Sequence, residues 1–253
     1  MRGLNRLIPA LTVLLLVVAC GRDAEITTTS TTTTSEPTST TSTPTITTAT
    51  TAATTTTGDQ IPGEPIDFGP GSGDAIDVVG VAHDDVLNVR ALPGTDAGII
   101  AELAPTETGL IATGHNRALP ESIWFEIEVG EGTGWVSSAF VGYLGTTDDA
   151  TAEVVEVLGN RPVAETMLDL GLIVAESLAS TEPESRITMT VAPTVGDLGE
   201  VTYDVLDLGD DAIGGYRLHV FGAPTDSGEG FSLMSVERTY ICSRGVSPEG
   251  LCP

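Results

Sequence analysis

Residues able to carry out covalent or metal-dependent chemistry are rare in this sequence. There are three cysteines and three histidines, at Cys20, Cys242, Cys252, His83, His115 and His219. No two histidines are four residues apart, as they are on a zinc-binding helix, and no histidine lies close to a cysteine in the sequence. We therefore predict no metal site, no cofactor and no catalytic residue.

Cys242 suggests one alternative, a cell-wall cysteine enzyme, because His219 precedes it and Arg244 follows it. An attacking thiolate needs a base in contact with it and hydrogen-bond donors for the oxyanion. The order resembles that of L,D-transpeptidases, which use a His and then a Gly-Cys pair followed by an Arg. Here Ile241 replaces the Gly, and Cys252 is placed to form a disulfide with Cys242, which would remove the free thiol. We expect no enzyme activity and keep this class as a remote alternative.

The two C-terminal cysteines favour a disulfide instead. Nine residues separate Cys242 from Cys252, and Gly245, Pro248 and Gly250 among them allow the chain to fold back. Such a pair forms a bridge in a protein outside the cytoplasm. For so short a loop the stabilisation is about 3 kcal/mol at most. We predict that the bridge pins the C-terminal tail to the last strand.

The first twenty residues have the features of an export signal. Arg2 and Arg6 precede an apolar run at 7–19, which is too short to span a bilayer comfortably. The run ends in the sequence VVACG, which resembles the bacterial lipobox. The resemblance implies that Cys20 is lipidated and becomes the mature N-terminus. We therefore expect an extracytoplasmic lipoprotein that is anchored to the bacterial membrane and does not span it.

The chain is strongly acidic. It contains 36 Asp and Glu residues against 10 basic residues, all of them Arg. Two arginines fall in the export signal, which has no acidic residue, so the mature chain carries 8 − 36 = −28 charges. Such a chain repels phosphate backbones and anionic lipids. We exclude nucleic acid as a partner and expect membrane contact only through the lipid anchor.

A low-complexity segment follows the export signal. Residues 27–57 contain 20 Thr and 4 Ser with no aromatic residue, so they cannot bury a core. We predict a disordered, Thr-rich linker over residues 21–73. The hydroxyl-rich composition leaves open whether the linker is a plain spacer or an O-glycosylated stalk.

Residues 74–146 read as short strands separated by turns, which is the pattern of an all-β barrel. The apolar or alternating runs lie at 76–82, 86–90, 99–103, 109–113 and 123–129. The glycine-rich stretch 130–134 predicts a tight hairpin, because glycine adopts the positive φ angles that such turns need.

The order of residues in this segment resembles the bacterial SH3-like domain of cell-envelope proteins. The matching residues are LNVR at 87–90, Pro93, Ile99, Ile100, Leu103, Gly109, Trp124, GWV at 134–136, Phe140 and Val141. The resemblance implies a small barrel that binds peptidoglycan or its peptides. Two features depart from the family: Thr106 or Glu107 replaces a common turn Gly, and the loop 114–121 is longer than usual.

Three residues of this segment are candidates for ligand contact. Trp124 and Tyr143 would offer exposed aromatic faces to a peptide or glycan. Arg90 would contact a ligand carboxylate or form a local salt bridge. For the aromatic residues the alternative is burial in the core of the barrel.

The pattern changes over residues 147–253. Apolar residues recur at helical spacing at 152–158 and 163–178, and Asp148 and Asp149 precede the first run as a helix cap. Alternating runs follow at 187–191, 201–205, 216–220 and 231–241, and the acids from Asp204 to Asp211 read as a solvated turn. We predict a small α+β domain, with one or two helices on an antiparallel sheet of about four strands.

Together these features predict a non-catalytic envelope lipoprotein whose SH3-like domain binds envelope material, with peptidoglycan or its peptides as the first expectation. The alternative is a structural or adaptor lipoprotein that docks an envelope protein. A fold does not fix a ligand, so the choice depends on the site.

Overall fold

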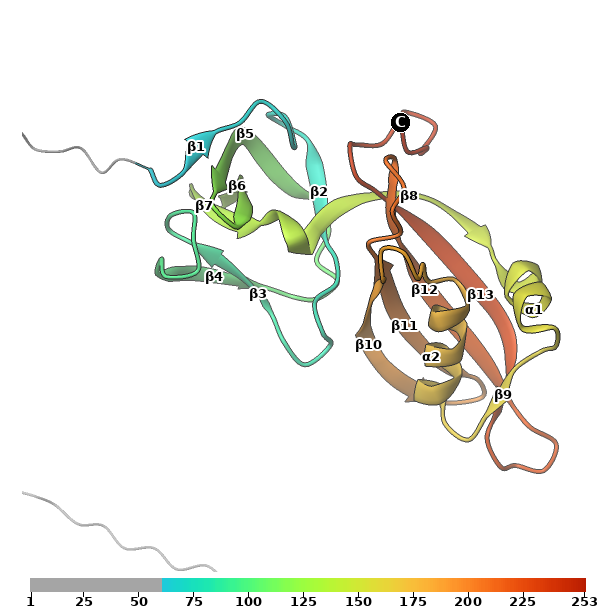
Figure 1. Ribbon diagram of the computed structural model, residues 1–253. Coiled ribbons are helices and arrows are strands. Elements are labelled where there is room, and N and C mark those ends of the chain that lie inside the picture. The colour runs from blue at the N-terminus through green and yellow to red at the C-terminus, as the bar shows by residue number, and fades with distance from the viewer. Residues whose placement is uncertain (1–60) are drawn as a thin grey trace, which may run out of the picture. The chain divides into compact units, whose positions relative to one another are not determined.

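The computed structural model describes residues 61–253 of the chain (Figure 1). The predicted export signal, the lipidated Cys20 and most of the Thr-rich linker lie outside the described residues. None of the helices in residues 61–253 combines the length and the apolar character that a membrane crossing requires.

The described chain is mainly antiparallel β-sheet with two α-helices. Hydrogen-bonded strands follow the order β10 (Arg186–Val195), β11 (Gly199–Leu206), β12 (Ile213–Pro224), β13 (Phe231–Cys242), β8 (Val141–Asp149), β2 (Ala75–Val78), β5 (Leu110–Leu119), β6 (Ser122–Val129), β7 (Gly132–Ser137), β3 (Leu87–Arg90) and β4 (Ile99–Leu103). The short strand β1 (Glu64–Pro65) is attached to β5, and β9 (Val163–Ala164) is attached to β13. This path is open, so closure of its first part into the predicted barrel is not confirmed.

We call residues 61–142 the first lobe. Its elements are β1 (Glu64–Pro65), β2 (Ala75–Val78), β3 (Leu87–Arg90), β4 (Ile99–Leu103), β5 (Leu110–Leu119), β6 (Ser122–Val129), β7 (Gly132–Ser137), the 3₁₀-helix η1 (Ser138–Phe140) and the start of β8 (Val141–Asp149). Alternate residues of these strands, such as Leu87 and Val89, form a buried apolar core. The predicted hairpin joins β6 to β7, and Gly130 adopts a φ of 59° there.

We call residues 143–253 the second lobe. Its further elements are α1 (Thr151–Leu158), β9 (Val163–Ala164), α2 (Met167–Ser177), β10 (Arg186–Val195), β11 (Gly199–Leu206), β12 (Ile213–Pro224) and β13 (Phe231–Cys242). Strands β10 to β13 form the predicted four-stranded meander, and α2 lies across one of its faces (Figure 1).

Two local features determine how α2 forms and packs: a glycine that faces the sheet and a side-chain cap at the start of the helix. A Cβ atom on Gly171 would lie 2.5 Å from Val201 Cγ1 and 2.6 Å from Tyr203 Cε2, so only glycine permits this approach to β11. At the start of α2, the Thr166 hydroxyl accepts a hydrogen bond from the Asp169 backbone N–H at 3.1 Å. The alternating residues of β11 to β13 supply the other side of this core.

The predicted end of the linker at residue 73 is wrong. Glu64 and Pro65 of β1 pair with β5, and the Asn116 side-chain N–H₂ donates to the carbonyl oxygens of Phe68 and Pro70 at 3.0 and 3.2 Å. A Cβ atom on Gly69 would lie 2.6 Å from the Phe125 ring. Residues 61–73 are therefore an ordered part of the first lobe. The predicted loop 114–121 is also wrong over most of its length, because β5 continues to Leu119.

Strand β8 runs through both lobes. Its first two residues pair with β2, and residues 143–149 pair with β13. A small apolar cluster of Val79, Leu206 and Ile241, with Leu144 against it, fills the space beside this shared strand. The lobes are therefore joined by backbone hydrogen bonds and apolar packing.

Candidate functional site

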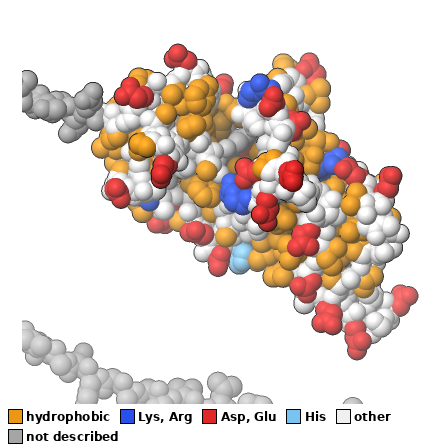
Figure 2. Space-filling view, in the orientation of Figure 1, with side chains coloured by type: hydrophobic (Ala, Val, Ile, Leu, Met, Phe, Trp, Pro, Cys, Tyr) orange, Lys and Arg blue, Asp and Glu red, His pale blue; other side chains and the backbone are white. Residues whose placement is uncertain are grey.

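A cleft of about 1290 Å³ lies between the two lobes. The first lobe contributes the segment after β2, from Val79 to Leu87, together with η1 and part of β6. The second lobe contributes the start of β10, the end of β11 and the residues around Cys242. Most lining residues are apolar, and Figure 2 shows a hollow between the lobes with hydrophobic side chains in it and basic side chains near its margin. A space of this size and character is typical of a binding site for a small or extended ligand.

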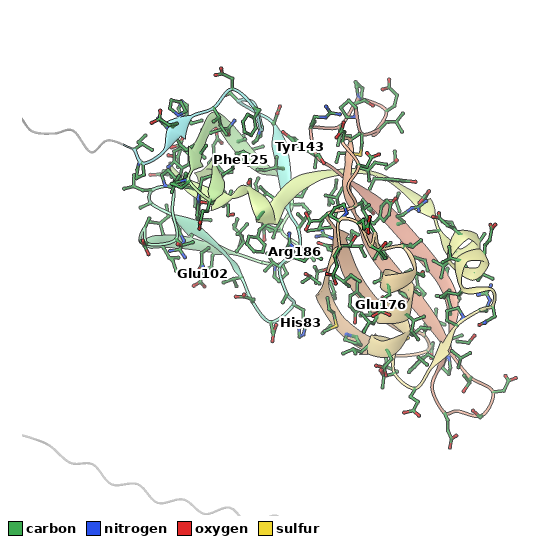
Figure 3. All side chains as sticks on the ribbon, in the orientation of Figure 1. His83, Glu102, Phe125, Tyr143, Glu176 and Arg186 are labelled. Carbon is green, nitrogen blue, oxygen red and sulfur yellow. A yellow bond between two sulfur atoms is a disulfide. The ribbon has the colours of Figure 1, made fainter. Side chains whose placement is uncertain are left out.

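Arg186 is the central polar residue of the cleft. It reaches from β10 to the first lobe, where it donates to the carbonyl oxygens of Gly80 at 3.2 Å and Ala139 at 2.8 Å (Figure 3). Its guanidinium carbon lies 5.3 Å from the centre of the Phe140 ring. Its Nε atom lies 3.7 Å from a carboxylate oxygen of Asp207. These contacts fix the orientation of a cation at the boundary of the lobes.

The charge of the cleft wall differs from that of the whole protein. Arg90, Arg186 and Arg244 line the cleft, against two acids, Asp85 and Asp207. The wall thus carries 3 − 2 = +1 formal charge, whereas the chain carries −26. Charges at a concave, poorly solvated surface act more strongly on a ligand than charges on an open surface. The cleft is therefore suited to an anionic group within an otherwise repellent protein.

A buried ion pair stands behind the cleft. Asp204 on β11 is 0% exposed and accepts two hydrogen bonds from Arg217 on β12, each at 2.8 Å. The same carboxylate accepts the Gly80 backbone N–H at 2.8 Å, and Arg217 donates to the Val78 carbonyl oxygen at 2.8 Å. Burial lowers the pKa of Arg217, but the hydrogen bonds and charge of Asp204 outweigh it and raise the pKa.

This arrangement, which we call the interlobe ion pair, also depends on Gly80. Its φ is 64°, and a Cβ atom there would lie 2.6 Å from both Arg186 Nη1 and Leu206 Cδ1. The prediction that Asp204 belongs to a solvated turn is wrong, because Asp204 lies within β11. One sequence signal points to the pair: Asp204 and Arg217 occupy outward positions in adjacent predicted strands, and they are direct cross-strand partners.

The three residues predicted to contact a ligand all line the same cleft. Arg90 donates to the Ala97 carbonyl oxygen at 2.7 Å, a local contact with the backbone in place of the salt bridge that the sequence left open. Tyr143 donates to Asp74 at 3.3 Å, and burial followed by the charge of Asp74 raises the pKa of Tyr143 to about 12. Trp124 is only 3% exposed and donates to the Ser122 hydroxyl at 2.9 Å. The expectation of an exposed Trp124 ring is therefore wrong.

The predicted disulfide is present, since Cys242 and Cys252 are bonded. The bridge occupies the sulfur that a cysteine enzyme would need. It also folds the tail back against β8, where the Thr146 N–H donates to the Gly250 carbonyl oxygen at 2.8 Å. His219 faces away from the core, as predicted, with its ring 3.3 Å from Glu200 and 4.1 Å between centroids from Phe221.

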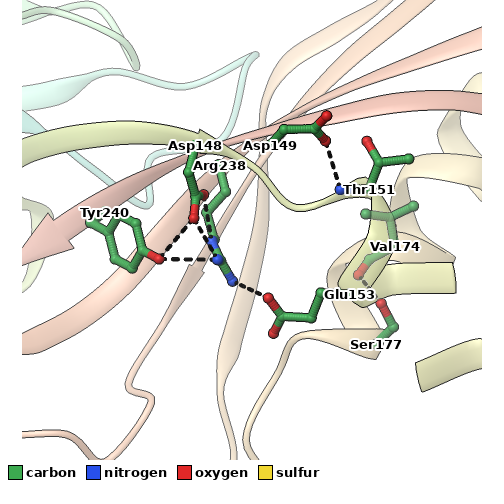
Figure 4. Close-up of polar contacts among 8 residues, drawn as sticks. All are labelled: Asp148, Asp149, Thr151, Glu153, Val174, Ser177, Arg238 and Tyr240. Carbon is green, nitrogen blue, oxygen red and sulfur yellow. Dashed lines mark hydrogen bonds and ion pairs between the residues drawn. The ribbon is translucent and has the colours of Figure 1, made fainter. Parts of the chain in front are cut away.

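A second arginine cluster lies beside α1, outside the cleft wall (Figure 4). Arg238 on β13 donates to Asp148 at 2.8 and 3.0 Å, to Glu153 at 2.8 Å and to the Tyr240 hydroxyl at 3.0 Å. Its guanidinium carbon lies 5.0 Å from the ring centres of Tyr216 and Tyr240. We call this the α1 arginine cluster. Its donors and acceptors are paired with one another, which indicates a structural role.

The two acids before α1 have different partners. Asp149 accepts the Thr151 backbone N–H at 2.9 Å, as a residue at a helix start does. The hydrogen bonds from Thr151 lower the pKa of Asp149. Asp148 instead binds Arg238, whose hydrogen bond is the main reason that the pKa of Asp148 is lowered. The predicted capping role is thus wrong for Asp148.

Glu126 is the centre of a local polar cluster in the first lobe. Glu126 accepts hydrogen bonds from Thr113 at 2.7 Å and Thr133 at 2.9 Å, and His115 Nδ1 lies 2.6 Å from it. Burial raises the pKa of Glu126, but these hydrogen bonds outweigh it and lower the pKa. Over residues 61–253, no group of three His, Cys, Asp or Glu side chains is arranged to hold a metal ion.

Comparisons with protein-family models, with curated proteins and with solved structures found no match to this chain.

Proposed function

We propose that this protein is a non-catalytic lipoprotein of the bacterial cell envelope that binds peptidoglycan or its peptides. In this proposal, lipidated Cys20 anchors the chain and the Thr-rich segment separates the folded part from the membrane. Residues 74–146 are a variant of the SH3-like fold with an open sheet. The observation that carries the proposal is the apolar cleft with a net positive wall.

The chemistry of the cleft supports a peptide ligand. Apolar residues such as Phe140 and Val86, which line the cleft and are partly exposed, would contact side chains, and Arg186 supplies an oriented cation beside them. Stem peptides of peptidoglycan combine small apolar side chains with carboxylates. The acidic remainder of the protein disfavours polyanions such as nucleic acid, so the cleft favours a short ligand with few negative charges.

Sedimentation with purified cell-wall sacculi tests this proposal. The full chain should sediment with intact sacculi and return to the supernatant when the sacculi are digested to soluble fragments. Absence from the pellet at every protein concentration would reject peptidoglycan binding.

A second function, docking of a protein partner, is favoured by one observation on the first lobe. Strand β4 forms one end of the sheet, and its Ile99 and Ile100 side chains are each half exposed. An exposed apolar edge strand is a common place for another chain to bind. If the protein is an adaptor, cross-linking in intact cells should give a discrete product with one partner. Ile99→Lys should remove that product and leave sedimentation with sacculi unchanged.

A further inference from the structure

The cleft has a preorganised cation that its own contacts do not saturate. A guanidinium group has five N–H donors, and the two carbonyl contacts of Arg186 use two of them. Asp207 lies 3.7 Å from Nε, beyond hydrogen-bond distance. The Arg186 side chain remains partly exposed, so the other N–H groups are open to a ligand in the cleft. Because planar N–H pairs match a carboxylate, Arg186 is suited to bind one.

A second arginine is brought to the same wall by the disulfide. Arg244 is exposed, lines the cleft and follows Cys242 by two residues. Within residues 61–253 its side chain forms no hydrogen bond or ion pair. The pKa of Asp210 is lowered mainly by the backbone N–H groups of Ile213 and Ala212, which its carboxylate accepts at 2.7 and 2.8 Å, and to a smaller extent by the charge of Arg244. Arg244 is thus available to a ligand.

One acid opposes these two cations, and its backbone is unusual. Asp207 has a φ of 67°, and it is the one residue other than glycine with a positive φ among residues 61–253. It also lines the cleft beside Arg186. Strained backbone of this kind is often found at binding sites, and asparagine tolerates the same conformation. Asp207 can therefore be neutralised without disturbing the chain.

We propose that the second-lobe wall of the cleft binds the terminal carboxylate of a peptide. Arg186 and Arg244 bind this carboxylate, and the negative charge of Asp207 weakens the binding. The apolar wall around Phe140 then takes the last side chains of the peptide. This inference rests on the proposed function and specifies the end of the stem peptide that the cleft recognises. It assigns the carboxylate to the second lobe, which the sequence did not connect with ligand binding.

Calorimetric titration of the full chain with a matched ligand pair tests the inference. The probes are diacetyl-Lys-D-Ala-D-Ala, which has one carboxylate, and the same peptide with a C-terminal amide. We expect the acid to bind about tenfold more tightly than the amide, since one charge-assisted contact is lost. Arg244→Gln should remove most of this difference, while Arg117→Gln, a change outside the cleft wall, should preserve it.

Asp207→Asn provides the sharper variant, because it predicts a gain. Binding of the acid should tighten about two- to threefold, as expected when a partly exposed opposing charge is removed, and binding of the amide should not change. Arg186→Gln also removes contacts between the lobes, so the Asp207 and Arg244 variants decide the outcome if it fails to fold. Equal affinity for acid and amide would overturn the inference, as would an Asp207→Asn variant without tighter binding. Retention on sacculi with equal affinities would reject only this inference and leave the proposed function standing.

Discussion

The interlobe ion pair and the α1 arginine cluster both clamp an arginine with carboxylates, but they differ in their access to water. In the interlobe ion pair, the side chains of Arg217 and Asp204 are 12% and 0% exposed. In the α1 arginine cluster, Arg238 is buried, yet its partners Asp148 and Glu153 are 43% and 51% exposed. The first pair joins the two lobes, and the second joins α1 to the sheet.

This difference in exposure determines how much each carboxylate contributes to the stability of the folded protein. A charge without water nearby depends entirely on its protein partners, so removal of one partner leaves the other uncompensated. A half-exposed carboxylate is largely solvated before and after pairing, and its contribution is small. Arg238 also has a second carboxylate, a hydroxyl and two aromatic rings around it, so the loss of one partner is shared.

The largest predicted effect is that of Asp204→Ala. This change leaves the Arg217 guanidinium buried without its carboxylate and the Gly80 N–H without its acceptor. We expect the free energy of unfolding to fall by about 3–5 kcal/mol. Denaturation of the full chain with guanidinium chloride measures this, and Asp211→Ala, at an exposed acid in the following turn, serves as the control. A loss below about 1 kcal/mol would contradict the assigned burial of the pair.

The double variant Asp204→Leu with Arg217→Leu separates charge from packing. Replacement of a buried ion pair by apolar residues of similar volume is often neutral or stabilising. We therefore expect the double variant to unfold at a higher guanidinium concentration than Asp204→Ala. A double variant as unstable as Asp204→Ala would show that the hydrogen bonds to Val78 and Gly80 contribute more than the charges.

Asp148→Ala should have a smaller effect than Asp204→Ala. Arg238 keeps its contacts with Glu153 and Tyr240, and water replaces the lost carboxylate. We expect the free energy of unfolding to fall by about 1 kcal/mol. Glu153→Gln, which removes the charge of the other partner, should cost no more. A loss as large as that of Asp204→Ala would mean that the α1 arginine cluster is not redundant.

The sequence predicted the second lobe better than the boundary between the lobes. Alternation in β11 to β13 identifies which residues face α2, because period-two burial leaves a direct pattern. The same pattern marks Asp204 and Arg217 only as outward-facing. It does not distinguish an outward face in water from one covered by another lobe, so their burial was not predictable from spacing.

The first lobe shows a related limit. Segment 61–73 has no apolar periodicity, and its order comes from backbone pairing of β1 and from the fit of Gly69 against Phe125. The sequence singles out Trp124, Tyr143 and Arg90, and all three line one cleft. Arg186 was missed because it begins a strand after a polar stretch, and its partners Gly80 and Ala139 are distant in the sequence.

The smallest predicted effect is a pH dependence of the unfolding free energy that comes from Asp148 in the α1 arginine cluster. Hydrogen bonds from Arg238 hold the pKa of the Asp148 carboxyl below its ordinary value of 3.8. A lowered pKa in the folded state means that the stabilisation is present above the unfolded-state pKa and is lost as pH falls through the folded-state pKa. The difference in unfolding free energy between the wild-type chain and Asp148→Asn should therefore shrink as pH falls from about 5 to about 2.

Because Asp148 is almost half exposed, this difference should not exceed about 1 kcal/mol even at its largest. Guanidinium denaturation at a series of pH values measures it, and Glu156→Gln on α1 is the matched control with an acid outside the cluster. A difference that stays constant over this pH range would show that Asp148 acts through packing or through its neutral hydrogen bonds. A difference that shrinks would assign part of the acid sensitivity of the protein to the α1 arginine cluster, where the carboxylates still reach water.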